Sequence, residues 1–381
     1  MISLPLNFSR TRLATAALSL IVLGLGNASW ADDVVPGLLP AIRKHVTLVS
    51  TVPENGDQNP YGVFVAPTSV GRIQQGDVYI SNFNNAANLQ GTGTTIVSYS
   101  PATKQLSTFA TLPHDLAGCP GGVGLGTALA VLKSGWVIVG STPSNDGTTR
   151  TKGPGCLIAL DAQGTVRKVF ADEKINDPWG NMAVIDKGDS ATLFVSNVGF
   201  GVGSPDGEPP VFNQSTILRI ELKLADQQPP EMVDETVVAH GFGEQADKSV
   251  FIVGPTGLAL GADDKLYVSD ALGNRISEIR EATTRSTSAG VGRTLTRGGF
   301  LSRPLAMVMT PQGHLLVTNG LNGKVIEIDP ATGTQLYAKW IDANKAQTPP
   351  GNGDLFGLAM HAGGGSFYYV EDDVNTLVLA Q

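Results

Sequence analysis

The chain is poor in charge, aromatic residues and cysteine, and these shortages exclude several classes of protein. It has 381 residues, of which 16% are charged and 6% are aromatic, with two cysteines. Its 26 lysines and arginines are outnumbered by 34 aspartates and glutamates, and no basic stripe occurs. Proteins that bind nucleic acid or anionic lipid concentrate positive charge on one face. We therefore expect no nucleic-acid partner for this acidic chain.

Long apolar runs are scarce as well. The candidate is Leu13–Gly26, about 14 residues, whereas a membrane-spanning helix needs about 20. Arg10 and Arg12 precede this run, and Ser29-Trp30-Ala31 places small residues at the two positions that define a cleavage point. Residues 1–31 are therefore predicted to be a signal peptide for general secretion, with a membrane anchor as the alternative. We expect the mature chain to be periplasmic or secreted, monomeric and without membrane insertion.

Motifs that identify common enzymes are missing. The sequence contains no G-x-S-x-G nucleophile elbow and no glycine-rich phosphate loop. Its five histidines do not show the short spacings that are typical of zinc sites. No complete catalytic set can be assembled from the sequence, so whether the chain is an enzyme stays open.

Glycine and proline are abundant, and they point to many turns. The chain has 46 glycines and 23 prolines without a collagen-like period, which favours an all-β protein. Residues 254–279 show the basic unit. Pro255-x-Gly257 opens an apolar run, a polar turn follows, and Leu266–Asp270 alternates before a Gly-Asn turn leads to a third alternating segment. Strands this short need neighbours to bury their faces.

This unit occurs six times, at intervals of about 50 to 70 residues. Each second strand begins with an apolar residue and ends on a small polar or acidic one: Asn82, Ser141, Asn197, Asp270, Asn319 and Glu371. The pattern predicts a six-bladed β-propeller in a single domain over residues 32–381. The expected blades are 60–111, 120–170, 178–239, 255–296, 304–340 and 355–381. The orphan strand at 45–51 is predicted to close the last blade, and a β-sandwich is the alternative fold.

The repeat also resembles a known family. Pro255-x-Gly257, Leu266-Tyr267-Val268-Ser269-Asp270, Gly273-Asn274-Arg275-Ile276 and the hairpin Asp329-Pro330-Ala331-Thr332-Gly333 look like the motifs of NHL-repeat propellers. These propellers lie near the SMP-30/gluconolactonase and strictosidine-synthase-like group, and the resemblance covers residues 45–381. It implies the fold strongly and function weakly, because such repeats serve lactonases, lyases and binding proteins alike. Related lactonases hold a divalent ion at the channel, but their Asn-Gly-Leu segment has no counterpart here, and Asn181 is the nearest match.

The strand ends give a candidate metal site. In a propeller these six positions form a ring on one face, which we call the ring face. Carboxylate and amide oxygens suit Ca²⁺ or another divalent cation. The predicted ligands are Asp270, Glu371, Asn82, Asn197 and Asn319. The alternative is that these side chains cap the turns that follow the strands.

Three long loops distinguish the first three repeats and should also project from the ring face: 83–93, 142–155 and 198–215. Long loops in a compact fold are commonly functional. We therefore expect an exported binding module that takes a small-molecule ligand or a protein partner on this channel face. The alternative is a divalent-metal-dependent hydrolase, lactonase or lyase of the SMP-30/NHL type.

The two cysteines fit the same map. Cys119 precedes the first strand of the second repeat, and Cys156 begins its third strand, so both fall on the ring face of one blade. In an exported protein this arrangement predicts a disulfide that tethers the loop at 142–155. Two free buried thiols are the alternative.

Overall fold

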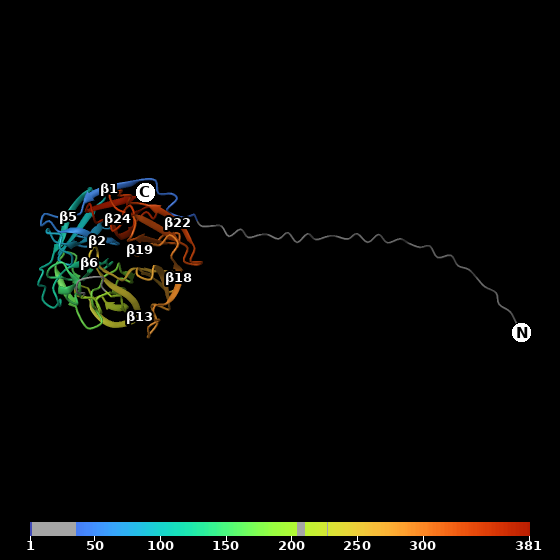
Figure 1. Ribbon diagram of the computed structural model, residues 1–381. Helices are drawn as coiled ribbons and strands as arrows, with labels where there is room; N and C mark the ends of the chain where they lie inside the picture. Colours follow the sequence, from blue (N-terminus) through green and yellow to red (C-terminus); the bar gives the residue numbers. More distant parts are fainter. Residues whose placement is uncertain (2–35, 204–209, 227) are drawn as a thin grey trace. The chain divides into compact units, whose positions relative to one another are not determined.

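Six antiparallel sheets in a ring make up the fold, which is a six-bladed β-propeller (Figure 1). The computed structural model describes residue 1 and residues 36–203, 210–226 and 228–381. Apart from Met1, the predicted signal peptide lies outside these ranges. Pro36–Gln381 forms one compact unit, and none of its described helices has the length and apolar character needed to cross a bilayer. The prediction of an all-β, six-bladed propeller is confirmed.

Four of the blades contain four strands that follow one another along the chain from the channel to the rim. Blade 1 consists of β2 (Gln58–Val65), β3 (Val78–Asn84), β4 (Thr95–Ser100) and β5 (Gln105–Thr111). Blade 2 consists of β6 (Leu125–Val131), β7 (Val137–Ser141), β8 (Cys156–Leu160) and β9 (Val166–Phe170). Blade 4 consists of β15 (Pro255–Leu260), β16 (Lys265–Asp270), β17 (Arg275–Arg280) and β18 (Arg293–Arg297). Blade 5 consists of β19 (Pro304–Met309), β20 (Leu315–Asn319), β21 (Lys324–Ile328) and β22 (Gln335–Trp340).

The sixth blade takes strands from both ends of the described chain. It consists of β23 (Leu355–Met360), β24 (Phe367–Glu371), β25 (Thr376–Ala380) and β1 (His45–Ser50). β1 pairs antiparallel with β25, from His45 opposite Ala380 to Ser50 opposite Thr376. The N-terminal strand therefore closes the last blade, as the sequence predicts, and supplies the outer partner that β25 would otherwise lack.

Blade 3 departs from the template. It consists of β10 (Ala183–Asp186), β11 (Ser190–Asn197), β12 (Phe212–Lys223), β13 (Glu231–Asp247) and β14 (Phe251–Val253). β13 has 17 residues, and its last three pair with β14, a fifth strand that the repeat pattern does not predict. This β13–β14 hairpin ends immediately before blade 4 begins at Pro255.

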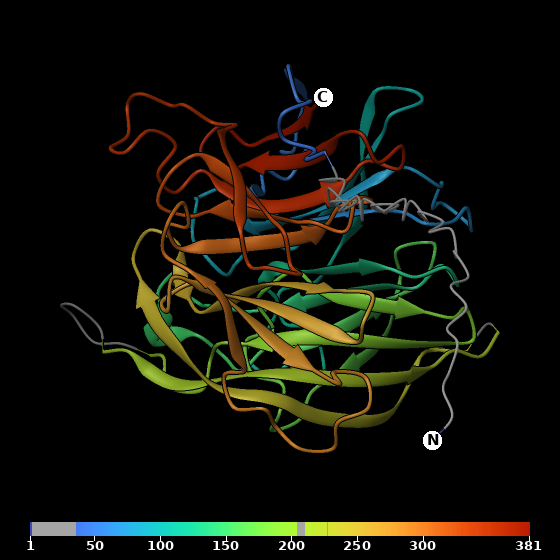
Figure 2. The same cartoon turned by 90° about the vertical axis from the view of Figure 1, so that its right-hand side faces the viewer.

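The repeated residues are explained by contacts between neighbouring blades. Ser269, in the Tyr-Val-Ser-Asp end of β16, accepts a hydrogen bond from the Gly257 amide and donates one to the Leu305 carbonyl of blade 5. Glycine is needed after Pro-x because the inner strands approach closely. A Cβ on Gly257 would lie 2.3 Å from that carbonyl oxygen, and one on Gly180 would lie 1.6 Å from the carbonyl oxygen of Thr256. The motif therefore lets adjacent inner strands pack closely. Figure 2 shows the sheets of neighbouring blades lying against one another.

Candidate functional site

The predicted ring residues lie at the ends of second strands, and three of them form hydrogen bonds with nearby turns and loops. Asp270 accepts a hydrogen bond from the Gly273 amide and forms an ion pair with Arg275, with 2.7 Å between Oδ2 and Nε. The side-chain oxygens of Asn197 and Asn319 accept hydrogen bonds from backbone amides in the preceding inter-blade loops, at 3.1 and 3.0 Å. Asp270 thus matches the turn-capping alternative, whereas Asn197 and Asn319 bond to the loop that precedes their blade.

In the part of the chain that the structure describes, the side-chain oxygens of the other two predicted ligands, Asn82 and Glu371, do not bond to backbone amides of nearby loops. Asn82 donates to the Thr51 carbonyl, but its Oδ1 is buried and has no hydrogen-bond partner among the described residues. Glu371 accepts a hydrogen bond from the Thr376 hydroxyl at 3.0 Å. Burial raises the pKa of Glu371 to about 7, and the nearby carboxylates Asp342 and Asp373 add to this rise. That the ring residues bind a metal stays a prediction.

The channel axis beside this ring is filled by aromatic side chains. Tyr61 and Trp179 stand between Pro and Gly in blades 1 and 3, and Phe356 occupies the equivalent position of blade 6, before Gly357. All three side chains are buried. Tyr61 stacks on Phe356 with 3.8 Å between ring centroids and meets Trp179 edge-on at 5.7 Å. Blades 1 and 3 are not neighbours, so the contact between Tyr61 and Trp179 crosses the axis.

Two further aromatic rings complete this cluster. Phe83, at the end of β3, stacks on Tyr61 at 4.7 Å and lies edge-on to Trp179 at 5.4 Å. Phe251, at the start of β14, meets Phe83 at 5.5 Å, so the extra hairpin of blade 3 packs onto the cluster. Tyr61, Phe83, Trp179, Phe251 and Phe356 are called the aromatic plug below. Sequence reasoning missed it, although the middle residues of two Pro-x-Gly motifs, Tyr61 and Trp179, gave a partial signal.

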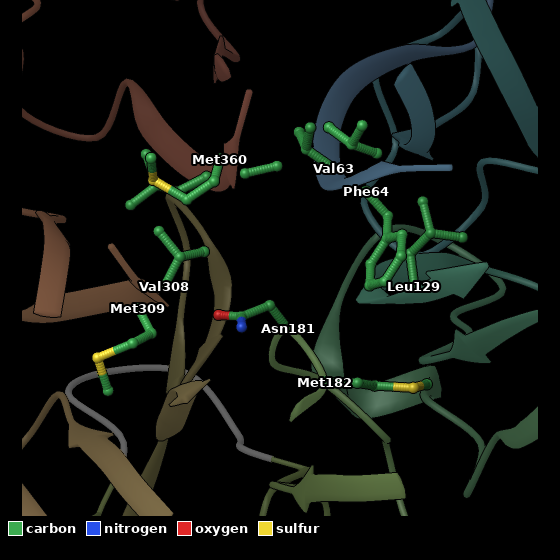
Figure 3. A pocket seen from close by; sticks show the side chains of 11 residues that line it. Val63, Phe64, Leu129, Asn181, Met182, Val308, Met309 and Met360 are labelled. Carbon is green, nitrogen blue, oxygen red and sulfur yellow. The ribbon is translucent and has the colours of Figure 1, made fainter. Parts of the chain in front are cut away.

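The other end of the inner strands surrounds an apolar pocket (Figure 3). Its volume is about 270 Å³, and of its 11 lining residues Asn181 alone is polar. The lining comes from the inner strands of blades 1, 2, 5 and 6 and from the segment that precedes β10. The residues are Val63, Phe64, Val65, Leu129, Asn181, Met182, Val308, Met309, Leu358, Ala359 and Met360. None of them titrates, so the pocket can bind apolar matter but offers no acid or base.

Asn181, the polar residue of the pocket lining, is held by backbone of two other blades. Its Nδ2 donates to the carbonyls of Leu258 and Met307, at 2.9 and 3.0 Å, and its Oδ1 accepts from the Met307 amide at 3.0 Å. The side chain of blade 3 thus crosslinks the inner strands of blades 4 and 5. Because its amide group makes three hydrogen bonds to backbone, Asn181 links the strands and is not available as a metal ligand.

The second long loop is fixed to the ring face in two ways. The Cys119–Cys156 disulfide is present, with 5.3 Å between the Cα atoms, as the sequence predicts. Lys152, in the same loop, forms an ion pair with Asp177 at 2.8 Å, and both side chains are almost fully buried. The Ser144 amide also donates to the Gly91 carbonyl at 2.7 Å, which joins the first two long loops.

The surroundings of Asp177 shift the pKa of its side chain. Burial raises its pKa to about 6, although Lys152 opposes the rise, and the buried Glu244 adds to it. Burial also raises the pKa of Glu244, whose Oε2 accepts a hydrogen bond from Ser215 at 2.6 Å. The buried carboxyl groups of Asp177 and Glu244 thus both lie near Lys152.

This environment predicts a pH dependence of stability. Between about pH 4 and pH 6 the folded protein keeps a proton on Asp177 that the unfolded chain releases, so the free energy of unfolding should fall as the pH rises through this window. A shift of about two pKa units corresponds to about 3 kcal/mol at most. Chemical denaturation from pH 4 to 7 should show a smaller decline in Asp177→Asn than in the unchanged protein. Equal declines would contradict the assignment.

Comparison with known proteins identifies the class of fold. No family model and no curated protein sequence matches the chain. Among solved structures, a luciferin-regenerating enzyme is 15% identical with a TM-score of 0.52, and the match covers 89% of this chain and 95% of that one. A gluconolactonase from Xanthomonas campestris is 14% identical with a TM-score of 0.51, over 89% and 88%. The calcium-binding protein regucalcin from Agrobacterium tumefaciens strain C58 is 12% identical with a TM-score of 0.50, over 87% and 92%.

These likenesses establish the architecture. The chain is a six-bladed propeller, and its fold is similar to the folds of these solved structures. At 12–15% identity the likeness concerns the fold and leaves the activity to be argued from the side chains of this chain.

Proposed function

We propose that the chain is an exported binding protein that takes a small apolar molecule in the pocket at the channel mouth opposite the ring face. The pocket carries the proposal: ten of its 11 lining residues are apolar, and its single polar side chain, Asn181, is already hydrogen-bonded to backbone. Its volume of about 270 Å³ lies near the lower end of ligand pockets, which are about 300–1,000 Å³. The ligand is therefore expected to be compact and apolar.

The lining also suits a ligand of variable shape. Met182, Met309 and Met360 are three of the six methionines in the chain, and Figure 3 shows their side chains around the pocket. Methionine is unbranched and polarisable, and it adapts to irregular partners. Met309, Met360 and Phe64 are half-buried, so a bound molecule would cover apolar surface that now meets water.

A neutral fluorescent probe tests the pocket directly. N-phenyl-1-naphthylamine should bind the purified protein, and Met360→Arg should weaken binding by about tenfold or more because it introduces a charge into apolar surroundings. The matched control is Val233→Arg, which changes an exposed valine on β13. Equal binding by both variants, with unchanged circular dichroism, would place the probe elsewhere and refute the proposal.

A metal-dependent hydrolase or lyase is the second candidate, and the state of Glu371 favours it. A carboxyl group with a pKa of about 7 can act as a general acid or base at neutral pH. The similar fold of the Xanthomonas gluconolactonase makes lactones the first substrates to try. Lactone hydrolysis that requires a divalent cation and is lost in Glu371→Gln would favour this candidate over the binding protein.

A further inference from the structure

Three aspartates meet where blade 5 joins blade 6, outside the apolar pocket. Asp342 follows β22, Asp354 precedes β23, and Asp373 lies in the turn between β24 and β25. One carboxylate oxygen from each residue lies within 4.8 Å of the corresponding oxygen of the other two. Separate segments of the chain thus bring three carboxyl groups to one point.

The partners of these carboxylates are neutral. The Asn344 amide donates to Asp342 Oδ1 at 2.9 Å, and Asn344 Nδ2 donates to Asp373 Oδ2 at 2.9 Å. Gln347 Nε2 donates to Asp354 Oδ1. Within the described ranges, no lysine or arginine is seen to form an ion pair with any of the three aspartates. Among the described residues, the three aspartates therefore have no lysine or arginine paired with them.

A second observation points to a missing ligand. Asp354 is 2% exposed, and its Oδ2 is buried without a hydrogen-bond partner among the residues that the structure describes. Gln347 Oε1, in the amide group that contacts Asp354, is likewise buried and unpartnered. An unpaired buried carboxylate oxygen is costly unless a hydrogen bond or a metal ion satisfies it.

We propose that Asp342, Asp354 and Asp373 form a Ca²⁺ site that ties blade 6 to blade 5. Calcium takes oxygen ligands at about 2.3–2.6 Å, so oxygens on one calcium ion lie within about 5 Å of one another, as these do. Magnesium, at about 2.0–2.1 Å with strict octahedral geometry, fits this spread less well.

The position gives the site a structural role. Blade 6 is the blade that β1 and β25 close, and β23 of that blade faces β19 of blade 5. An ion held by the end of blade 5, the start of β23 and the β24–β25 turn joins the closing blade to its neighbour. Calcium should therefore stabilise the folded state by binding to it and not to the unfolded chain.

The test uses purified protein that has been stripped with a chelator. Calorimetric titration should show one Ca²⁺ per chain, and the melting temperature should rise by about 2–5 °C at millimolar Ca²⁺, with a smaller rise in Mg²⁺. Asp354→Asn and Asp373→Asn should each abolish the response to Ca²⁺. In the chelator, Asp354→Asn should melt at or above the temperature of the unchanged protein, because it removes charge repulsion. Asp263→Asn, at an exposed surface aspartate, is the matched control and should keep the response.

The same titration separates this site from the ring prediction. Asp270→Asn should keep the full response to Ca²⁺, because Asp270 is paired with Arg275. Loss of the response in Asp270→Asn but not in Asp354→Asn would overturn the proposal in favour of the ring. Absence of Ca²⁺ binding at millimolar concentrations, or an unchanged response in both Asp354→Asn and Asp373→Asn, would also overturn it.

Discussion

Replacing Trp179 with alanine should lower the free energy of unfolding by about 3–5 kcal/mol, the usual cost of removing a large buried aromatic side chain. Trp179 is 1% exposed and makes edge-on contacts with Tyr61 and Phe83. It belongs to the aromatic plug, where inner strands of non-adjacent blades meet. The neighbouring side chains cannot fill the cavity that the truncation leaves, because the ring of blades holds the surrounding strands apart.

Trp340 provides a control within the same chain. It lies at the end of β22, is 48% exposed, and contacts Lys324, whose Nζ lies 3.9 Å from the ring centroid. Trp340→Ala should therefore cost about 1 kcal/mol or less. Urea denaturation followed by far-ultraviolet circular dichroism would measure both variants. Equal costs would show that Trp179 does not fill the channel as described.

The fold could be predicted because its determinants are local and repeated. The hydrogen bond between Gly257 and Ser269 recurs between Gly62 and Ser81 in blade 1 and between Gly180 and Ser196 in blade 3, because adjacent inner strands must pack closely. The strand predicted at 45–51, which is β1 in the structure, can be assigned to the last blade because the sixth repeat otherwise has three strands. The β13–β14 hairpin escaped prediction because it occurs in one blade, and a repeat pattern carries no information about a unique insertion.

The site could be predicted only in part, because it depends on which side chains meet across the ring. The sequence located the strand-end positions, yet Asp270 is paired with Arg275, five residues away, and alternation alone does not show such a pair. The aromatic plug and the apolar pocket arise from equivalent positions in different blades. Their side chains become neighbours only when the ring closes. The polarity of each end of the channel therefore depends on side chains from several blades together.

The acidic junction was missed for a related reason. Asp342 and Asp354 belong to a connection between blades, and Asp373 belongs to a hairpin turn, so no spacing in the sequence marks them as a group. Glu371, which was predicted as a ligand, lies close enough for Asp342 and Asp373 to raise its pKa. The prediction thus pointed to acidic residues in blade 6 without showing which carboxylates lie together.

Removing the disulfide should cost nearly as much as removing Trp179, by a different mechanism. Cys119 and Cys156 are 37 residues apart, and closing a loop of this length in the unfolded chain is worth about 3–4 kcal/mol in the chain-entropy model. The double variant Cys119→Ser/Cys156→Ser should lose about that much free energy of unfolding in urea. Both sulfurs are buried, so the native protein should resist reductant until it unfolds. Fully reduced, unchanged protein should match the double variant. A difference of less than about 1 kcal/mol between oxidised protein and the variant, or two alkylatable thiols in oxidised protein, would contradict the disulfide.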